Sequence, residues 1–175
     1  MRGAHLRAAR AHAPADAPAH GDGVRVMFDA SALVQRYAAE AGHARVLALM
    51  EQADQVLVAA HCLSEVGAGL LRLRRDGCLA QAEFDRAWVA VQRDVADMVR
   101  VPVDDRVERF AFAAMEREPL RVTDALHLGS ALVAHVDMFV TADRRVAQLA
   151  RSLGLPSECL EDEVNPKTEE VMVAP

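Results

Sequence analysis

Short apolar runs alternate with helical stretches along most of the chain, and this alternation constrains the fold more than any other feature of the sequence. Residues 24–29 (VRVMFD) are typical of a buried strand, and similar runs follow at 55–59, 98–103 and 137–142. Helical spacing marks the segments between them, at 31–39, 43–51, 62–75, 79–95, 105–117, 123–135 and 144–153. Strands separated by helices favour a parallel sheet covered on both faces. The sequence therefore predicts an α/β fold, a three-layer α/β/α sandwich whose mostly parallel sheet has four to five strands, with SECL at 157–160 as the optional edge strand.

The length of 175 residues fits one domain with short tails. Residues 1–23 are rich in Ala, His, Pro and Gly and lack apolar periodicity, so we expect a disordered extension or an upstream translation start. The folded domain is expected at 24–160. Residues 161–175 are acidic and contain two prolines, which predicts a flexible tail.

Composition and charge narrow the classes of function. No apolar run is long enough to span a bilayer, and the first residues lack the apolar core of a secretory signal. The three cysteines, Cys62, Cys78 and Cys159, are widely spaced and odd in number, which predicts reduced thiols and a cytoplasmic protein. The net charge of −6 opposes bulk attraction to nucleic acid, so such a function would need local arginines or a metal-loaded site.

Four acidic residues are placed where strands end or helices begin. Asp29 closes the first strand, and Asp143 directly follows the fourth. Glu65 lies near the start of the helix at 62–75, and Asp124 opens the helix at 123–135. Each residue alone fits an ordinary role, because an N-cap aspartate contributes about 1 kcal/mol and a first-turn glutamate complements the helix dipole.

The four acids together favour a different interpretation, because ligands bind at the carboxyl edge of an open parallel sheet. Clustered carboxylates repel one another, so a fold gains nothing by gathering them unless a cation lies among them. Oxygen ligands suit Mg²⁺ or Mn²⁺, and we expect no histidine or cysteine beside the acids, which disfavours zinc. One or two such ions would activate a water for attack on phosphate and offset the negative charge of the site.

Four segments carry a family resemblance: FDASALV at 28–34, LSEV at 63–66, TDALHL at 123–128 and VTADRR at 140–145. In order and spacing they resemble the motifs of PIN domains, most closely the VapC-type ribonuclease toxins of bacterial toxin–antitoxin pairs, over residues 24–160. The resemblance implies that Mg²⁺ or Mn²⁺ is bound for RNA cleavage by four residues, Asp29, Glu65, Asp124 and Asp143. It also implies that Ser31 and Thr141 support the site.

The same resemblance implies a small antitoxin protein as partner, and a homodimer. The apolar helices at 62–75 and 79–95 could supply the contact surfaces or could equally belong to the core. Arg144 and Arg145 are placed to hold RNA phosphate, although a surface ion pair is an equally good interpretation.

Other side chains have simpler interpretations. His127, one turn beyond Asp124, is expected to be a hydrogen-bonded core residue, and His61 to cap its helix or face solvent. The basic run at Arg72, Arg74 and Arg75 suits the C-terminus of a helix.

The same residues bear on alternative functions. A phosphatase or receiver domain would need a second aspartate in place of Ser31 or a suitably placed lysine, and Lys167 in the tail is the only lysine. A non-catalytic module that binds RNA or protein, and a metal-dependent DNA nuclease, both remain open. RNA is preferred as substrate only because of the family resemblance.

Overall fold

A five-stranded parallel sheet forms the centre of the molecule in the computed structural model, which describes residues 23–38 and 41–163. The strands are β1 (Arg25–Phe28), β2 (Gln55–Ala59), β3 (Val99–Val101), β4 (Met138–Thr141) and β5 (Ser157–Cys159). Their order is β3-β2-β1-β4-β5, and every neighbouring pair is parallel. The predicted α/β sandwich is therefore confirmed, with the edge strand from SECL present.

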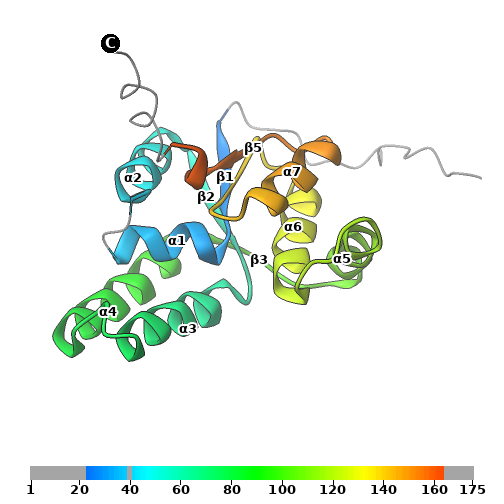
Figure 1. Cartoon of the computed structure of the whole chain (residues 1–175). Helices are drawn as coiled ribbons and strands as arrows, with labels where there is room; N and C mark the ends of the chain where they lie inside the picture. Colours follow the sequence, from blue (N-terminus) through cyan, green and yellow to red (C-terminus); the bar gives the residue numbers. More distant parts are fainter. Residues whose placement is uncertain (1–22, 39–40, 164–175) are drawn as a thin grey trace, which may run out of the picture.

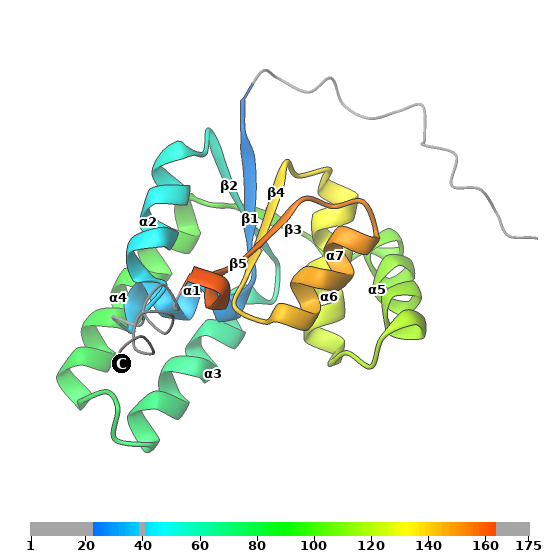
Figure 2. The same ribbon diagram turned by 45° about the horizontal axis from the view of Figure 1, so that its top comes forward.

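Helices cover both faces of the sheet (Figures 1 and 2). One layer holds α1 (Ala30–Tyr37), α2 (His43–Gln52), α3 (Cys62–Arg75) and α4 (Gln81–Asp97). The other holds α5 (Asp105–Arg117), α6 (Val122–Ala134) and α7 (Arg144–Ser152), and the 3-10 turn η1 (Leu160–Glu163) ends the described chain. These bounds agree with the predicted ones to within two residues. The predicted extension at 1–23 lies outside the described residues except for Gly23, and the predicted tail lies outside them from residue 164.

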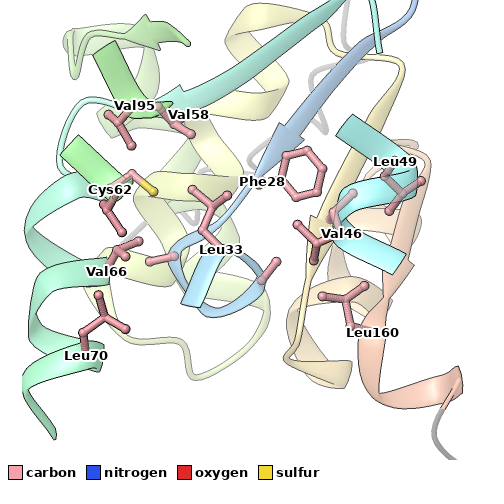
Figure 3. Close-up of a cluster of buried hydrophobic side chains, with 14 of the residues drawn as sticks. Phe28, Leu33, Val46, Leu49, Val58, Cys62, Val66, Leu70, Val95 and Leu160 are labelled. Atoms are coloured by element: carbon pink, nitrogen blue, oxygen red, sulfur yellow. The ribbon is translucent and has the colours of Figure 1, made fainter. Parts of the chain in front are cut away.

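The strand residues divide between two apolar clusters because side chains alternate across a sheet. On β1, Val26 and Phe28 face the layer of α1 to α4, whereas Met27 faces the layer of α5 to α7. Figure 3 shows Phe28 among residues of the first cluster, with Val46 and Leu49 of α2 beside it. Burial on both faces explains why the strands read as continuous apolar runs.

The cysteines and the hydropathy of the helices are as follows in the structure. Cys62 and Cys159 are buried, Cys78 is exposed, and none of the three forms a disulfide. Among the described helices, none has the length and hydropathy needed to cross a membrane.

Two of the four acids cap helices at the carboxyl edge of the sheet. Asp29 precedes α1 and accepts a hydrogen bond from the backbone N–H of Ala32, and Asp143 caps α7 through the N–H of Arg145. The alternative interpretation of Asp124 as a helix cap does not hold. Helix α6 begins one residue earlier than predicted, so Arg121 holds the N-cap position and Asp124 is the third helical residue.

Gly129 allows α5 and α6 to pack closely, and replacing it tests that packing. A Cβ atom at Gly129 would lie 2.5 Å from the carbonyl oxygen of Val107 and 3.1 Å from the backbone nitrogen of Ala111. We expect Gly129→Ala to lower the free energy of unfolding by about 1–3 kcal/mol, because backbone must move to relieve the overlap. Urea denaturation measures the change. Ser130→Ala is the matched control, since the buried Ser130 hydroxyl has no hydrogen-bond partner among the described residues, and an equal loss in both variants would contradict the prediction.

Candidate active site

A pocket of about 180 Å³ opens at the carboxyl edge of the sheet. Its lining includes three of the four predicted acids, Asp29, Glu65 and Asp124, which come from the end of β1, from α3 and from α6. The cationic side chains in the lining are Arg72 and Arg121. The pocket therefore combines carboxylates from three elements with arginines, a combination suited to a cation and a phosphate.

Asp29 is the most deeply buried of these acids, with 4% of its surface exposed. Its Oδ1 accepts hydrogen bonds from the Ala32 N–H at 2.8 Å and from the Ser31 hydroxyl at 2.7 Å. Burial raises the pKa of Asp29, and the charge of His127 with the hydrogen bonds from Thr141, Ala32 and Ser31 offsets only part of that rise. A bound cation would remove this penalty on the ionised form.

Two hydroxyl groups join the loop after β1 to the loop after β4. The Ser31 hydroxyl oxygen lies 3.4 Å from that of Thr141 and accepts the Ala142 N–H at 2.9 Å. Thr141 in turn accepts the Asp143 N–H at 3.0 Å. Asp143 is not in the pocket lining, but this chain of hydrogen bonds fixes its loop against that of Asp29.

Glu65 contacts two histidines, which corrects the expectation that no histidine accompanies the acids. Its Oε2 accepts a hydrogen bond from His127 Nε2 at 2.5 Å and lies 3.5 Å from His61 Nε2. Burial alone would raise the pKa of Glu65, but hydrogen bonds from His127 and Thr123 and the charges of both histidines lower it overall. His127 is buried and hydrogen-bonded, as predicted for a core histidine, yet its partner is a site residue.

His61 has neither of the two predicted roles, capping its helix or facing solvent. It precedes α3, but its side chain makes no capping hydrogen bond, and 21% of the side chain is exposed. It instead packs against His127, with ring centroids 4.3 Å apart. The spacing of four residues between His61 and Glu65 is the sequence signal that could have placed them together.

Arg72 and Arg121 line the pocket, whereas the sequence predicted Arg144 and Arg145 as contacts for RNA phosphate and Arg72 as part of a basic helix end. Arg121 contacts Asp124 through two nitrogens, Nε to Oδ2 at 2.9 Å and Nη2 to Oδ1 at 3.2 Å, although 73% of its side chain is exposed. Arg144 and Arg145 are exposed, and Arg145 lies 3.8 Å from Asp143. Sequence reasoning missed Arg121, whose spacing of three residues from Asp124 was the available signal.

The fold and this pocket define an α/β protein with an acidic site at the carboxyl edge of a parallel sheet. Residues 26–152 match the family model described as PIN domain. The chain belongs to the PIN domain family, as its motifs predicted. No curated protein sequence matches the chain.

Solved structures share the fold at low sequence identity. VapC20 of Mycobacterium tuberculosis, described as a Sarcin-Ricin loop cleaving toxin, is 19% identical with a TM-score of 0.54, covering 70% of this chain and 93% of that one. VapBC2 of Rickettsia felis, solved with a DNA fragment from its promoter, is 11% identical with a TM-score of 0.57, covering 78% and 98%. VapBC-1 of nontypeable Haemophilus influenzae is 11% identical with a TM-score of 0.54, covering 79% and 99%.

Proposed function

We propose that the chain is a divalent-metal-dependent endoribonuclease that hydrolyses RNA phosphodiester bonds and serves as the toxin of a toxin–antitoxin pair. The observation that carries the proposal is the pocket that Asp29, Glu65 and Asp124 line together. Membership of the PIN domain family supports nuclease chemistry. The fold shared with a toxin described as cleaving the Sarcin-Ricin loop supports RNA as the substrate.

The donor set fits Mg²⁺ or Mn²⁺, which prefer carboxylate oxygens. Asp29, Glu65, Asp124 and Asp143 would hold the ion or ions. The raised pKa of the buried Asp29 is consistent with such a site, because a cation would stabilise its ionised form. When bound, the metal would lower the pKa of a water and neutralise charge on the phosphate during attack.

Other residues of the chain would position these groups and the RNA. Ser31 and Thr141 would fix the loops that carry Asp29 and Asp143 through the hydrogen bonds between them. Arg121 and Arg72 line the pocket and would contact RNA phosphates, together with the exposed Arg144 and Arg145. Local positive charge would thus offset the net charge of −6 near the substrate.

The proposal includes a small antitoxin, a homodimer and a cytoplasmic location. Solved VapBC structures with the same fold support the antitoxin, and the free thiols are consistent with the cytoplasm. Helices α3 and α4, considered as contact surfaces, contribute much of the core instead. Phe110 and Phe112 of α5 are 43% and 61% exposed but lie on opposite sides of the helix, so Phe112 alone is proposed as an apolar contact of the dimer.

Cleavage by the full chain tests the proposed activity. The protein, purified without a partner, is incubated with an RNA pool and with single-stranded DNA, in Mg²⁺ or Mn²⁺ and in EDTA. We expect metal-dependent cleavage of RNA by the wild type and none by Asp124→Asn. Cleavage of DNA alone would identify a DNA nuclease, and RNA binding without cleavage by the wild type would identify a binding module. Equal cleavage by Asp124→Asn would contradict the assigned site or indicate a contaminating nuclease.

Stabilisation by Mg²⁺ is expected to grow as the pH rises. The pKa of Asp29 is raised above its ordinary 3.8, so the folded chain holds this proton more tightly than the unfolded chain. Without metal, Asp29 makes its whole contribution to the free energy of unfolding below pH 3.8, where it is protonated. This contribution is lost as the pH rises through the folded-state pKa. Mg²⁺ binds the ionised carboxylate and offsets that loss.

Scanning calorimetry in Mg²⁺ and in EDTA, repeated at several pH values, measures this effect as a difference in Tm. In Asp29→Asn the dependence of that difference on pH should be weaker. A difference in the wild type that does not change with pH would contradict the prediction.

A further inference from the structure

Glu65 and the two histidines beside it form a cluster of their own at one side of the pocket. His61 precedes α3, Glu65 lies one turn along that helix, and His127 comes from α6. The Nε2 atoms of His127 and His61 lie 2.5 Å and 3.5 Å from Glu65 Oε2. One nitrogen or oxygen atom from each residue lies within 4.8 Å of the others, which is a spacing that one metal ion can bridge.

The hydrogen bond from His127 Nε2 to Glu65 connects α6 to α3, but it does not account for His61 or for the buried Nδ1 of His127. Both ring nitrogens of His61 are buried, and neither has a hydrogen bond of good geometry among the described residues. The polar neighbours of the ring include the backbone of Thr123, which makes a weak hydrogen bond to it, and Glu65 Oε2, which lies 3.5 Å from Nε2. Unpartnered buried nitrogens are costly in a protein interior. One of them, Nε2, faces a carboxylate and a second imidazole, where a cation would satisfy its lone pair.

We propose that His61, Glu65 and His127 form a binding site for a transition-metal ion of the Zn²⁺ class. Two imidazole nitrogens and one carboxylate oxygen are a typical ligand set for Zn²⁺ with a position left open. Mg²⁺ prefers oxygen ligands and is not suited to this set. The sequence disfavoured zinc because no histidine was expected beside the acids. In the structure, two histidines lie beside Glu65.

The geometry fits such an ion after a small adjustment. Ligand atoms about 2.0–2.1 Å from a tetrahedral Zn²⁺ lie about 3.3 Å apart. The distance of 3.5 Å between His61 Nε2 and Glu65 Oε2 is close to this value. The 2.5 Å contact between His127 and Glu65 must open, so the ion replaces a hydrogen bond with coordination.

Glu65 would be shared between this site and the proposed Mg²⁺ site, because it lines the same pocket as Asp29 and Asp124. Zn²⁺ bound to Glu65 Oε2 would take this carboxylate away from the proposed Mg²⁺ site. It would also place a second positive charge beside Asp29 and Asp124. Zn²⁺ should therefore suppress Mg²⁺-dependent cleavage. This consequence rests on the proposed function, whereas Zn²⁺ binding does not.

Binding is tested on the full, untagged chain by calorimetric titration with Zn²⁺ and by the visible spectrum of added Co²⁺. Since His5, His12 and His20 of the N-terminal segment could bind Zn²⁺, all proteins carry glutamine at these positions. In the absence of Mg²⁺ we expect one Zn²⁺ per chain and a Co²⁺ spectrum that indicates nitrogen ligands. His61→Gln and His127→Gln should each weaken Zn²⁺ binding at least about tenfold.

Two controls keep the test decisive. Asp143→Asn should leave Zn²⁺ binding unchanged, and so should His135→Asn, which removes an imidazole elsewhere at a left-handed position that asparagine tolerates. His61→Gln decides the outcome if the buried His127→Gln fails to fold. No Zn²⁺ bound by the wild type, or equal affinity in His61→Gln, would overturn the proposal.

Cleavage assays then test the sharing of Glu65. Zn²⁺ should inhibit the wild type in saturating Mg²⁺ and should inhibit His61→Gln less. Zn²⁺ binding without inhibition would contradict the sharing but keep the site. If the chain cleaves no RNA at all, the proposed function fails and the titration still decides the metal site.

Discussion

Asp29→Asn is expected to lower the rate of metal-dependent RNA cleavage by about 100-fold or more while leaving the fold intact. The amide keeps an oxygen that can accept hydrogen bonds from the Ala32 N–H and the Ser31 hydroxyl, so the cap of α1 survives. It removes the charge that a divalent ion would require. Because burial already disfavours the ionised carboxylate, the metal-free variant should be at least as stable as the wild type.

Asp104→Asn is the matched control for this change. Asp104 caps α5 through the N–H groups of Arg106 and Val107, so it has the same local role as Asp29 but is not in the pocket lining. Its variant should cleave RNA at the wild-type rate. Initial rates in Mg²⁺, together with Tm values in EDTA, separate loss of activity from loss of fold. If Asp29→Asn cleaves RNA as fast as Asp104→Asn, Asp29 is not part of the active site.

The largest loss of stability is expected for Phe28→Ala, at about 3–5 kcal/mol in the free energy of unfolding. The ring of Phe28 is fully buried at the end of β1, among residues of α1 and α2 (Figure 3). Truncation would leave a cavity between the sheet and helices α1 and α2, because the surrounding strand and helices cannot collapse to fill it.

Urea denaturation in EDTA measures this loss without any contribution from bound metal. Phe28→Leu keeps most of the apolar volume and should lose less stability. Val89→Ala shortens a side chain that is 66% exposed on α4, and we expect a change within about 0.5 kcal/mol. A loss in Phe28→Ala no larger than that in Val89→Ala would show that the ring is not part of a tightly packed core.

The elements of the fold could be predicted because both faces of the sheet are covered. Short apolar runs rich in β-branched residues, such as 56–59, favour buried strands, and the intervening helices exclude direct hairpins. The rule for parallel sheets then placed Asp29 and Asp143 at one edge, since each directly follows a strand. The strand order did not follow from the sequence, because the pairing of β1 with β4 joins distant segments.

The missed parts of the candidate site depend on contacts between helices. Asp124 follows no strand, so only the family resemblance placed its helix beside the other acids. The meeting of His61 with His127 brings the residue before α3 against the middle of α6, which no local pattern encodes. Arg121 was missed because its role depends on where α6 begins, and helix ends are uncertain by one or two residues.

Anomalous diffraction from crystals soaked with Mn²⁺ tests most directly whether the acids form a metal site. The account predicts a peak in the pocket at the carboxyl edge of the sheet, coordinated by at least two of the carboxylates of Asp29, Glu65, Asp124 and Asp143. The peak should be lost in crystals of Asp29→Asn. A well-diffracting soaked crystal with no manganese at these carboxylates would contradict the account, and so would a peak there that persists at full strength in Asp29→Asn.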